Sequence, residues 1–325
     1  MQAIVQQTYG SADVLALREL PDPVAGPDEI IVRVQACAVT PADIAFREGR
    51  PWVARLFSGV LRPRNPVPGL AFAGEVENVG ARVTRFERGD RVFGSAMTAG
   101  GHAERVRVRQ DAVVTHLPDE LTWAEGLGAE GSHTALWFLR EVAGVRSSDR
   151  VLVNGASGEV GSTAVQLAKH FGAEVTAVCS GRNAAWVREL GADHVVDYTV
   201  TPLREVAGPF ELWFDAVGKS SFGVARPQLA PGARYLTTVP SLAILLQMAW
   251  TFVFRGKRAG IATAGLHQSV AQLEELAELV RTGVLRPRVD RSYPLAEAAA
   301  AHRYVETGRK RGSVLLCPPS PATEP

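Results

Sequence analysis

A glycine-rich turn between a strand and a helix constrains the fold of this chain most strongly. Residues 151–169 read VLVNGASGEVGSTAVQLAK, where an apolar run precedes three glycines and a helical pattern follows. Glycine lets backbone N–H groups approach a pyrophosphate, and the helix N-terminus adds a partial positive charge. The pattern predicts a dinucleotide-binding turn, with contacts from Gly155, Ala156, Ser157, Gly158, Glu159, Val160 and Gly161. The alternative is a tight strand-to-helix turn without a ligand.

The end of the next predicted strand indicates which dinucleotide binds. Residues 173–178 (AEVTAV) lead into CSGRN at 179–183, about twenty residues past the glycines. NAD sites usually carry Asp or Glu here for the ribose 2′-OH, and this segment has neither. Because arginine offers planar donors suited to a phosphate, we predict NADPH, with Ser180 and Arg182 on its 2′-phosphate. The alternative places Arg182 in solvent, in the first turn of the next helix.

Length and composition are those of a globular protein with two domains. The chain has 325 residues, of which 46% are hydrophobic and 21% charged, and a net charge of +1. This balance gives no reason to expect a nucleic acid as partner. The N-terminus shows no secretory signal, and the cysteines at 37, 179 and 317 are too far apart in sequence to suggest a disulfide framework or a Cys-x-x-Cys metal site. We therefore expect a cytoplasmic protein.

One apolar stretch, residues 242–254 (LAILLQMAWTFVF), needs a separate interpretation. It is shorter than the about twenty residues that a membrane-spanning helix requires. We predict a buried or interface helix, without stable membrane insertion. Contact with a membrane surface is the alternative, because the basic residues RGKR follow the apolar run.

The periodicity of apolar residues changes along the chain and predicts its organisation. Up to about residue 120, short apolar runs alternate with Gly and Pro, which is typical of a barrel-like β domain. Residues 124–142 read as helical. Strands predicted at 151–153, 175–178, 194–196, 212–215 and 234–237 then alternate with helical segments, as in a doubly wound parallel sheet. An amphipathic helix is predicted at 268–282 and a strand at 313–317.

With these pieces placed, the chain resembles the medium-chain dehydrogenase/reductase superfamily, and most of all its zinc-free quinone oxidoreductase and enoyl or alkenal reductase branch. The matching segments include EIIVRVQACAVTPADIAFREG, VPGLAFAGEVENVG, GASGEVGSTAVQLAK, ELGADHVVDY and FDAVGKSSF. The resemblance implies an α/β fold with a Rossmann doubly wound parallel sheet inserted into a GroES-like β-barrel domain. Residues 1–122 and 265–325 would form the GroES-like catalytic domain, and residues 123–264 the Rossmann NADPH-binding domain. The active site would lie in the cleft between them, and a homodimer is expected.

The resemblance also implies that no metal is bound. Zinc-dependent relatives place Cys and His just before the Asp of the first quoted segment, and a second His after Pro-Gly. Here these positions hold Thr40, Pro41 and Leu70. Catalytic zinc needs about three protein ligands from Cys, His and carboxylate, so the site cannot be assembled from them.

The chemistry predicted from these features is hydride transfer to a small-molecule substrate, either a quinone or an α,β-unsaturated carbonyl. Reduction of an enone creates an enolate, whose oxygen needs hydrogen-bond donors. Thr40 is a candidate donor, and Arg47 is a candidate stabiliser if it turns inward. Asp43 is the third candidate catalytic residue. The alternative is that its carboxylate is a structural hydrogen-bond acceptor in the turn.

Further cofactor contacts are expected at other strand and helix ends. They are Thr134, Tyr198, Ala216, Val217, Gly218 and Thr238. Lys219 and Ser220 are expected to cap the helix that follows. Two other functions stay open: a zinc-free carbonyl or alcohol oxidoreductase, and a non-catalytic NADPH-binding redox sensor.

Overall fold

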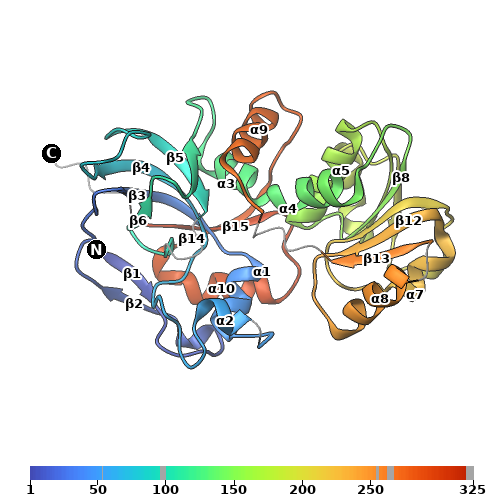
Figure 1. The fold of residues 1–325 in the computed structure, drawn as a ribbon, viewed down its shortest axis with the longest axis horizontal. Coiled ribbons are helices and arrows are strands. Elements are labelled where there is room, and N and C mark those ends of the chain that lie inside the picture. The colour runs from blue at the N-terminus through green and yellow to red at the C-terminus, as the bar shows by residue number, and fades with distance from the viewer. Residues whose placement is uncertain (53, 96–99, 254–255, 262–266, 320–325) are drawn as a thin grey trace. The chain divides into compact units, whose positions relative to one another are not determined.

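Two compact units make up the computed structural model, which describes residues 1–52, 54–95, 100–253, 256–261 and 267–319 (Figure 1). The first unit comprises Met1–Glu130, Ser269–Arg281 and Pro287–Pro325, and the second comprises Gly131–Gln268 and Thr282–Arg286. The C-terminal part of the chain therefore returns to the first unit. Residues 123–130, expected in the nucleotide-binding domain, lie in the first unit, and the expected boundary at 264–265 lies outside the described residues.

The first unit is built around a mostly antiparallel sheet. Its strand order is β14 (Val289–Pro294), β15 (Ser313–Cys317), β3 (Glu29–Ala38), β4 (Ala71–Val79), β5 (Arg91–Ser95) and β7 (Val113–His116), while β6 (Arg105–Arg109) also pairs with β3. A separate antiparallel pair is formed by β1 (Gln2–Val5) and β2 (Ala16–Glu19). Alternate residues of β3, among them Ile30, Val32 and Val34, enter the core of this unit.

Helices close the core of the first unit. They are α1 (Pro41–Glu48), α2 (Ala54–Ser58), α3 (Trp123–Gly131), α9 (Val270–Arg281) and α10 (Ala298–Glu306), with short 3₁₀ turns at Ala12–Val14 and Leu295–Glu297. The face of α9 that carries Leu273, Leu276 and Val280 is buried, as its periodicity predicts. On α10, Ala298, Ala301 and Val305 enter the same core as β3.

The second unit is a six-stranded sheet in which every pairing is parallel. Its order is β10 (His194–Asp197), β9 (Glu174–Cys179), β8 (Arg150–Asn154), β11 (Phe210–Asp215), β12 (Leu229–Thr237) and β13 (Arg258–Ile261). Successive strands run outward from β8 to β10, and the chain then crosses back to β11. This is the predicted doubly wound Rossmann sheet, with its reversal of strand order between β8 and β11.

Helices cover both faces of this sheet. They are α4 (His133–Leu136), α5 (Glu159–His170), α6 (Ala184–Glu189), α7 (Phe222–Ala225) and α8 (Leu242–Val253), with a π-helical turn at Trp137–Ala143 and 3₁₀ turns at Gly181–Asn183, Leu203–Glu205 and Arg226–Gln228. Trp213 of β11 packs with Phe222 and Ile244 beneath α7 and α8, and its neighbour Phe214 meets Phe138 on the opposite face, 5.1 Å between ring centroids. The continuous helix predicted at 124–142 is thus divided into α3, α4 and the π-helical turn.

Residues 242–254 were predicted to form a buried or interface helix, and the structure rules out only the buried alternative, because most of this helix is exposed. α8 covers 242–253, and residue 254 lies outside the described residues. Only Ile244 and Thr251 of this helix are buried. Helix α8 packs beside β13 (Figure 1). No helix among the described residues has the length and apolar character needed to cross a membrane.

Candidate functional site

The candidate site begins where the strand order of the second unit reverses. The chain leaves β8 at Asn154 and β11 at Asp215, and Asn154 Nδ2 donates a hydrogen bond to Asp215 Oδ1 at 3.0 Å. Ligands of open α/β sheets bind outside the carboxyl ends of the strands at such a reversal. All the predicted cofactor contacts of the second unit except Thr134 follow the carboxyl end of one of its strands.

The glycine turn after β8 is shaped by close backbone packing at two of its three glycines. Gly155 has φ +83°, and a Cβ there would lie 2.4 Å from Val217 Cγ1. A Cβ on Gly161 would lie 2.1 Å from the carbonyl oxygen of Gly155, so helix α5 approaches the turn more closely than any side chain permits. These two positions explain why the sequence has glycine there.

Gly158 is different, because the space beside it is open. A Cβ at Gly158 would meet only the carbonyl oxygen of Gly155, at 3.5 Å. Gly158 is the N-cap of α5 and contributes no side-chain cap, so N–H groups in the first turn of the helix lack an intrahelical partner. The helix N-terminus therefore presents donors and a partial positive charge beside an open position, which suits an anion such as a pyrophosphate.

Asn183 joins this turn to the loop that follows β9. Its Nδ2 donates to Ser157 Oγ at 2.9 Å and to Ser180 Oγ at 3.3 Å. The side chain is only 5% exposed, and its Oδ1 is buried with no hydrogen-bond partner in the described part of the protein. We did not predict this residue, although an amide three residues after Ser180, next to a glycine turn, is the signal that could have found it.

Three predicted contacts for the adenosine end surround the same loop. Ser180 is half-buried, Arg182 is exposed, and Tyr198 is 56% exposed while its backbone N–H donates to the carbonyl of Cys179 at 3.1 Å. Arg182 makes no hydrogen bond or ion pair within the described residues, so its guanidinium is available to a ligand. Its solvent exposure also fits the alternative of a solvated residue.

A carboxylate at the next strand end was not anticipated. Asp197 closes β10, and its Oδ1 accepts bonds from the Thr199 hydroxyl at 2.7 Å and the Thr199 backbone N–H at 2.9 Å. The Thr199 hydroxyl is the main cause that holds the pKa of Asp197 below its usual range. A Cβ on Gly181 would lie 2.3 Å from Asp197 Oδ2, so this carboxylate lies directly against the loop before Arg182.

Asp215 organises the turn after β11. This carboxylate is fully buried and accepts bonds from the Tyr235 hydroxyl at 3.1 Å and from the backbone N–H groups of Val217, Lys219 and Ser220 at 3.2, 3.4 and 2.8 Å. Burial, together with the neighbouring Asp215 charge, raises the pKa of Tyr235, which stays a donor. The carboxylate thus holds in place the backbone of the predicted contacts Ala216, Val217 and Gly218.

Two further predictions concern the ends of this turn. Lys219 and Ser220 were wrongly predicted as helix caps, because Ser221 is the N-cap of α7 and its Oγ accepts from Val224 N at 3.3 Å. Thr238 lies after β12, and its backbone N–H donates to the carbonyl of Asp215 at 3.2 Å. The turn after β11 and the end of β12 are therefore in direct contact.

Unlike the other predicted cofactor contacts, Thr134 lies on a helix that precedes the sheet of the second unit in sequence. It is half-buried on α4, whose preceding residue Ser132 contacts Thr163 of α5 through their hydroxyls at 3.2 Å. This contact places α4 against the helix that begins at the glycine turn. A π-helical turn follows α4, a feature that is frequent at functional sites.

The three candidate catalytic residues belong to the first unit, where Thr40 is the N-cap of α1 and Asp43 and Arg47 lie within this helix, but Arg47 makes its contacts in a different polar network. Thr40 caps this helix: its Oγ1 donates to Asp43 Oδ2 at 2.6 Å and accepts from Asp43 N at 3.3 Å, while Thr40 N donates to Asp43 Oδ2 at 2.8 Å. Asp43 is 2% exposed and also accepts from Leu70 N at 3.1 Å. The structure therefore brings Thr40 and Leu70 together around a carboxylate that acts as a structural acceptor.

This geometry corrects the role given to Thr40. A hydroxyl has a single proton to donate, and that proton lies on the bond to Asp43. Donation from Thr40 to a substrate oxygen would have to break the capping box. Asp43 in turn is occupied by three donors, which favours the structural alternative stated for it.

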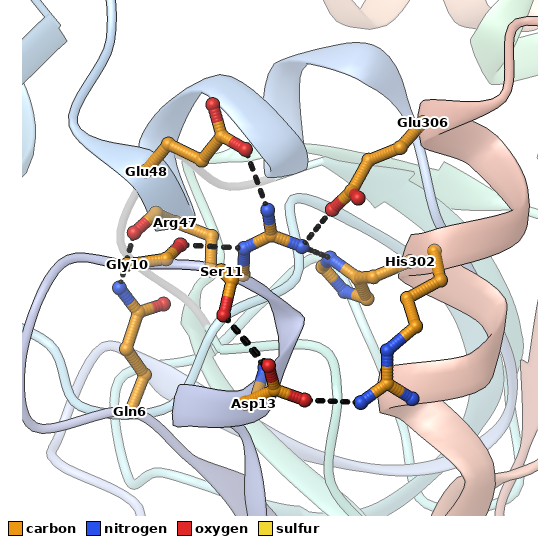
Figure 2. A network of polar contacts seen from close by, with 9 residues as sticks. Gln6, Gly10, Ser11, Asp13, Arg47, Glu48, His302 and Glu306 are labelled. Carbon is orange, nitrogen blue, oxygen red and sulfur yellow. Dashed lines mark hydrogen bonds and ion pairs between the residues drawn. The ribbon is translucent and has the colours of Figure 1, made fainter.

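Arg47 does not turn toward an open space and is the centre of a buried polar network (Figure 2). Its Nε donates to the Gly10 carbonyl at 3.1 Å, Nη2 pairs with Glu48 at 2.9 Å, and Nη1 pairs with Glu306 at 2.6 Å and approaches His302 Nδ1 at 3.4 Å. Burial lowers the pKa of His302 to about 2, so its ring is neutral and Nδ1 can accept. Because every nitrogen of the guanidinium has a partner, the expected stabiliser role of Arg47 is not supported.

The described residues contain no group of three or more His, Cys, Asp or Glu side chains placed to hold a metal ion. Around Asp43, the groups that could act as metal ligands are the Thr40 hydroxyl, the Asp43 carboxylate and backbone groups. These groups already form hydrogen bonds with one another.

Comparison with known proteins adds independent information. Residues 26–137 match the family described as alcohol dehydrogenase GroES-like domain, and residues 190–316 match the family described as zinc-binding dehydrogenase. A curated relative, the chloroplastic quinone-oxidoreductase homolog of Spinacia oleracea, is 30% identical and covers 98% of both chains. This relationship extends over both units of the structure.

Two solved structures share the fold over nearly their full length. The quinone oxidoreductase from Coxiella burnetii is 28% identical, with a TM-score of 0.88, and covers 98% of this chain and 99% of its own. A mycobacterial protein complexed with NADPH is 26% identical, with a TM-score of 0.82, and covers 98% of this chain and all of its own. With the parallel sheet, its glycine turn and these relatives, the chain belongs to the medium-chain dehydrogenase/reductase superfamily, in the zinc-free quinone oxidoreductase branch.

Proposed function

We propose that this protein is a zinc-independent, NADPH-dependent oxidoreductase that reduces a quinone or an α,β-unsaturated carbonyl. The observation that carries the proposal is the open helix N-terminus at Gly158, located where the strand order reverses. The names of the relatives, a quinone-oxidoreductase homolog and a protein solved with NADPH, support it. When bound, a reduced nicotinamide supplies the hydride.

The residues of the second unit bind and orient this cofactor. In this proposal the backbone N–H groups at the start of α5 hold the pyrophosphate, because those of Ala156 and Gly158 already donate to the carbonyls of Val178 and Gly155. Ser180 and Arg182 hold the 2′-phosphate. Tyr198 lies beside the adenosine. The backbone of residues 216–218, with Thr134 and Thr238, lines the nicotinamide half. The buried Asn183 Oδ1, which lacks a donor among the described residues, suits a hydroxyl or ordered water of the bound state.

A proton must reach the reduced acceptor, and the described residues of α1 offer no free donor for it. The Thr40 proton is donated to Asp43, and the Arg47 guanidinium is fully paired. We therefore propose that water protonates the product. Residues 1–122 and 265–325 would bind the substrate, residues 123–264 would bind NADPH, and the active form would be a homodimer.

The test is NADPH oxidation by the purified protein across a panel of quinones, enals and enones. We expect turnover with at least one class, loss of the carbon–carbon double bond in enone products, and no requirement for added zinc. A saturated ketone supports the proposal, whereas an allylic alcohol would assign a carbonyl reductase instead. Tight NADPH binding with no turnover on any acceptor would favour a redox sensor.

A further inference from the structure

Helix α8 exposes an entirely apolar face. The exposed residues of this helix are Leu242, Ala243, Leu245, Leu246, Ala249, Trp250, Phe252 and Val253. Phe252 is 89% exposed and Leu246 is 63% exposed, while the polar residue Thr251 is turned inward. Helices at the surface of soluble domains normally show the opposite arrangement, and contiguous exposed apolar patches mark interaction sites.

The segment that carries α8 is also strongly basic. Residues 216–273 contain six Lys and Arg and neither Asp nor Glu, whereas the remainder of the chain has 29 basic and 34 acidic residues. This segment therefore has a formal charge of +6 in a chain whose net charge is +1. A field of one sign over an apolar face attracts an anionic partner.

Three of these cations adjoin α8 in the structure. The Arg226 guanidinium lies over the Trp250 ring, 5.2 Å from its centroid, and Lys257 Nζ donates to the Arg226 carbonyl at 2.7 Å. Arg258 is exposed at the start of β13, the strand against which α8 packs. None of the three forms an ion pair with a carboxylate in the described ranges, so no acidic side chain there neutralises their charges.

We propose that this face docks the protein on the surface of an anionic lipid bilayer. Leu246, Trp250 and Phe252 would enter the boundary between headgroups and acyl chains, and Arg226 and Lys257 would meet lipid phosphates. Twelve helical residues span about 18 Å, which is long enough to lie in this boundary and too short to cross it. The proposal does not depend on the proposed enzymatic function.

Charge favours a bilayer over a second copy of the chain as the occupant of this face. A two-fold interface through α8 would place the same cations of both copies near one another, with no acidic residue in 216–273 to compensate. An anionic bilayer instead supplies phosphates for the cations and an apolar phase for the exposed side chains in one surface.

The experiment is flotation of the purified full-length protein with lipid vesicles. We expect the protein to float with phosphatidylcholine vesicles that contain about a third phosphatidylglycerol, and not with phosphatidylcholine alone. High salt should release part of the bound protein. The double variant Leu246→Gln, Phe252→Gln should lower partitioning by about tenfold or more, since two large apolar side chains no longer leave water. Lys257→Gln with Arg258→Gln should weaken the preference for anionic lipid, while Arg226 remains in place.

The matched control is Val24→Gln, which replaces an apolar side chain of the first unit that is 79% exposed. It should bind vesicles like the wild type, and the variants at Leu246, Phe252 and Val24 should keep the wild-type Tm because these side chains are exposed. Failure of the wild type to float with anionic vesicles would overturn the proposal. So would equal loss in Val24→Gln, or concentration-dependent dimers that Leu246→Gln, Phe252→Gln abolishes without any vesicle binding.

Discussion

Two alanine substitutions in the glycine turn should separate cofactor binding from stability. At Gly158 the backbone has φ −81° and a Cβ would meet nothing closer than 3.5 Å, so Gly158→Ala should change the free energy of unfolding by less than about 1 kcal/mol. A bound pyrophosphate needs the same open space. Loss of one or more charge-assisted N–H bonds to it costs about 1.5–3 kcal/mol, so the Kd for NADPH should rise roughly 10- to 150-fold.

Gly161→Ala should behave in the opposite way. Its Cβ would lie 2.1 Å from the Gly155 carbonyl oxygen and 2.9 Å from Ala156 Cα, and both are backbone atoms that cannot rotate away. The helix and the turn must separate, at a cost of about 1–3 kcal/mol, which lowers Tm by roughly 2–12 °C. Thermal unfolding without cofactor and a fluorescence titration with NADPH measure both quantities. Wild-type NADPH affinity in Gly158→Ala would refute the placement of the pyrophosphate, and an unchanged Tm in Gly161→Ala would refute the close approach.

Three further substitutions test other parts of the structure. Arg182→Asp should raise the KM for NADPH about 10- to 100-fold and leave NADH nearly unaffected, with Arg188→Asp on the adjacent α6 as control; equal effects on both cofactors would remove the 2′-phosphate assignment. Arg47→Met should lower the free energy of unfolding in urea by about 2–4 kcal/mol, less than the loss of a fully buried pair, because its carboxylate partners are about a third exposed. Arg47→Lys should lower it less. A urea midpoint equal to the wild type in Arg47→Met would contradict the network. His302 has a folded pKa of about 2 against 6.5 when unfolded, so below pH 6.5 only the unfolded chain gains its proton, and stability should fall by about 1.4 kcal/mol per pH unit. His302→Gln should flatten that acid limb of the stability profile, and an identical profile in the variant would refute the assignment.

Local sequence patterns were sufficient for most of the fold. Five of the six described strands of the second unit were predicted, because buried parallel strands are short apolar runs between turns, and β8, β9, β11 and β12 have that form. The edge strand β13 was not predicted. The glycine turn was predicted because two of its glycines meet a local steric need, visible as spacing in the sequence. Features fixed by neighbouring residues can be read from a single chain.

Features fixed by distant residues could not be predicted in the same way. Asp215 binds Asn154 across 61 positions, and Asn183 binds Ser157 across 26, so neither partnership has a local signature. Arg47 was predicted as a candidate stabiliser if it turned inward, and its structural partners could not be foreseen because Gly10 and Glu306 come from opposite ends of the chain.

For the segment predicted at 242–254, the helix is confirmed, and only the expectation of burial was wrong, for another reason. Apolar composition normally indicates burial, but the sheet covers only one side of this helix and leaves the rest in water. Composition indicates which segments are apolar. It does not indicate whether the fold has enough surface to bury them.

The return of the C-terminal segment to the first unit imposes an order on folding during synthesis. β15 lies between β14 and β3, and Cys37 Sγ donates to the Leu316 carbonyl across 279 residues. The strands of the second unit all lie between residues 150 and 261, so the ribosome completes that sheet while the first one still lacks β14 and β15. Strand β3 pairs with β4 and β6 from the start, but its C-terminal end at Cys37 and Ala38 lacks the pairing with β15 until the chain has been made past residue 317. During that interval this strand end is exposed to chaperones that bind nascent chains.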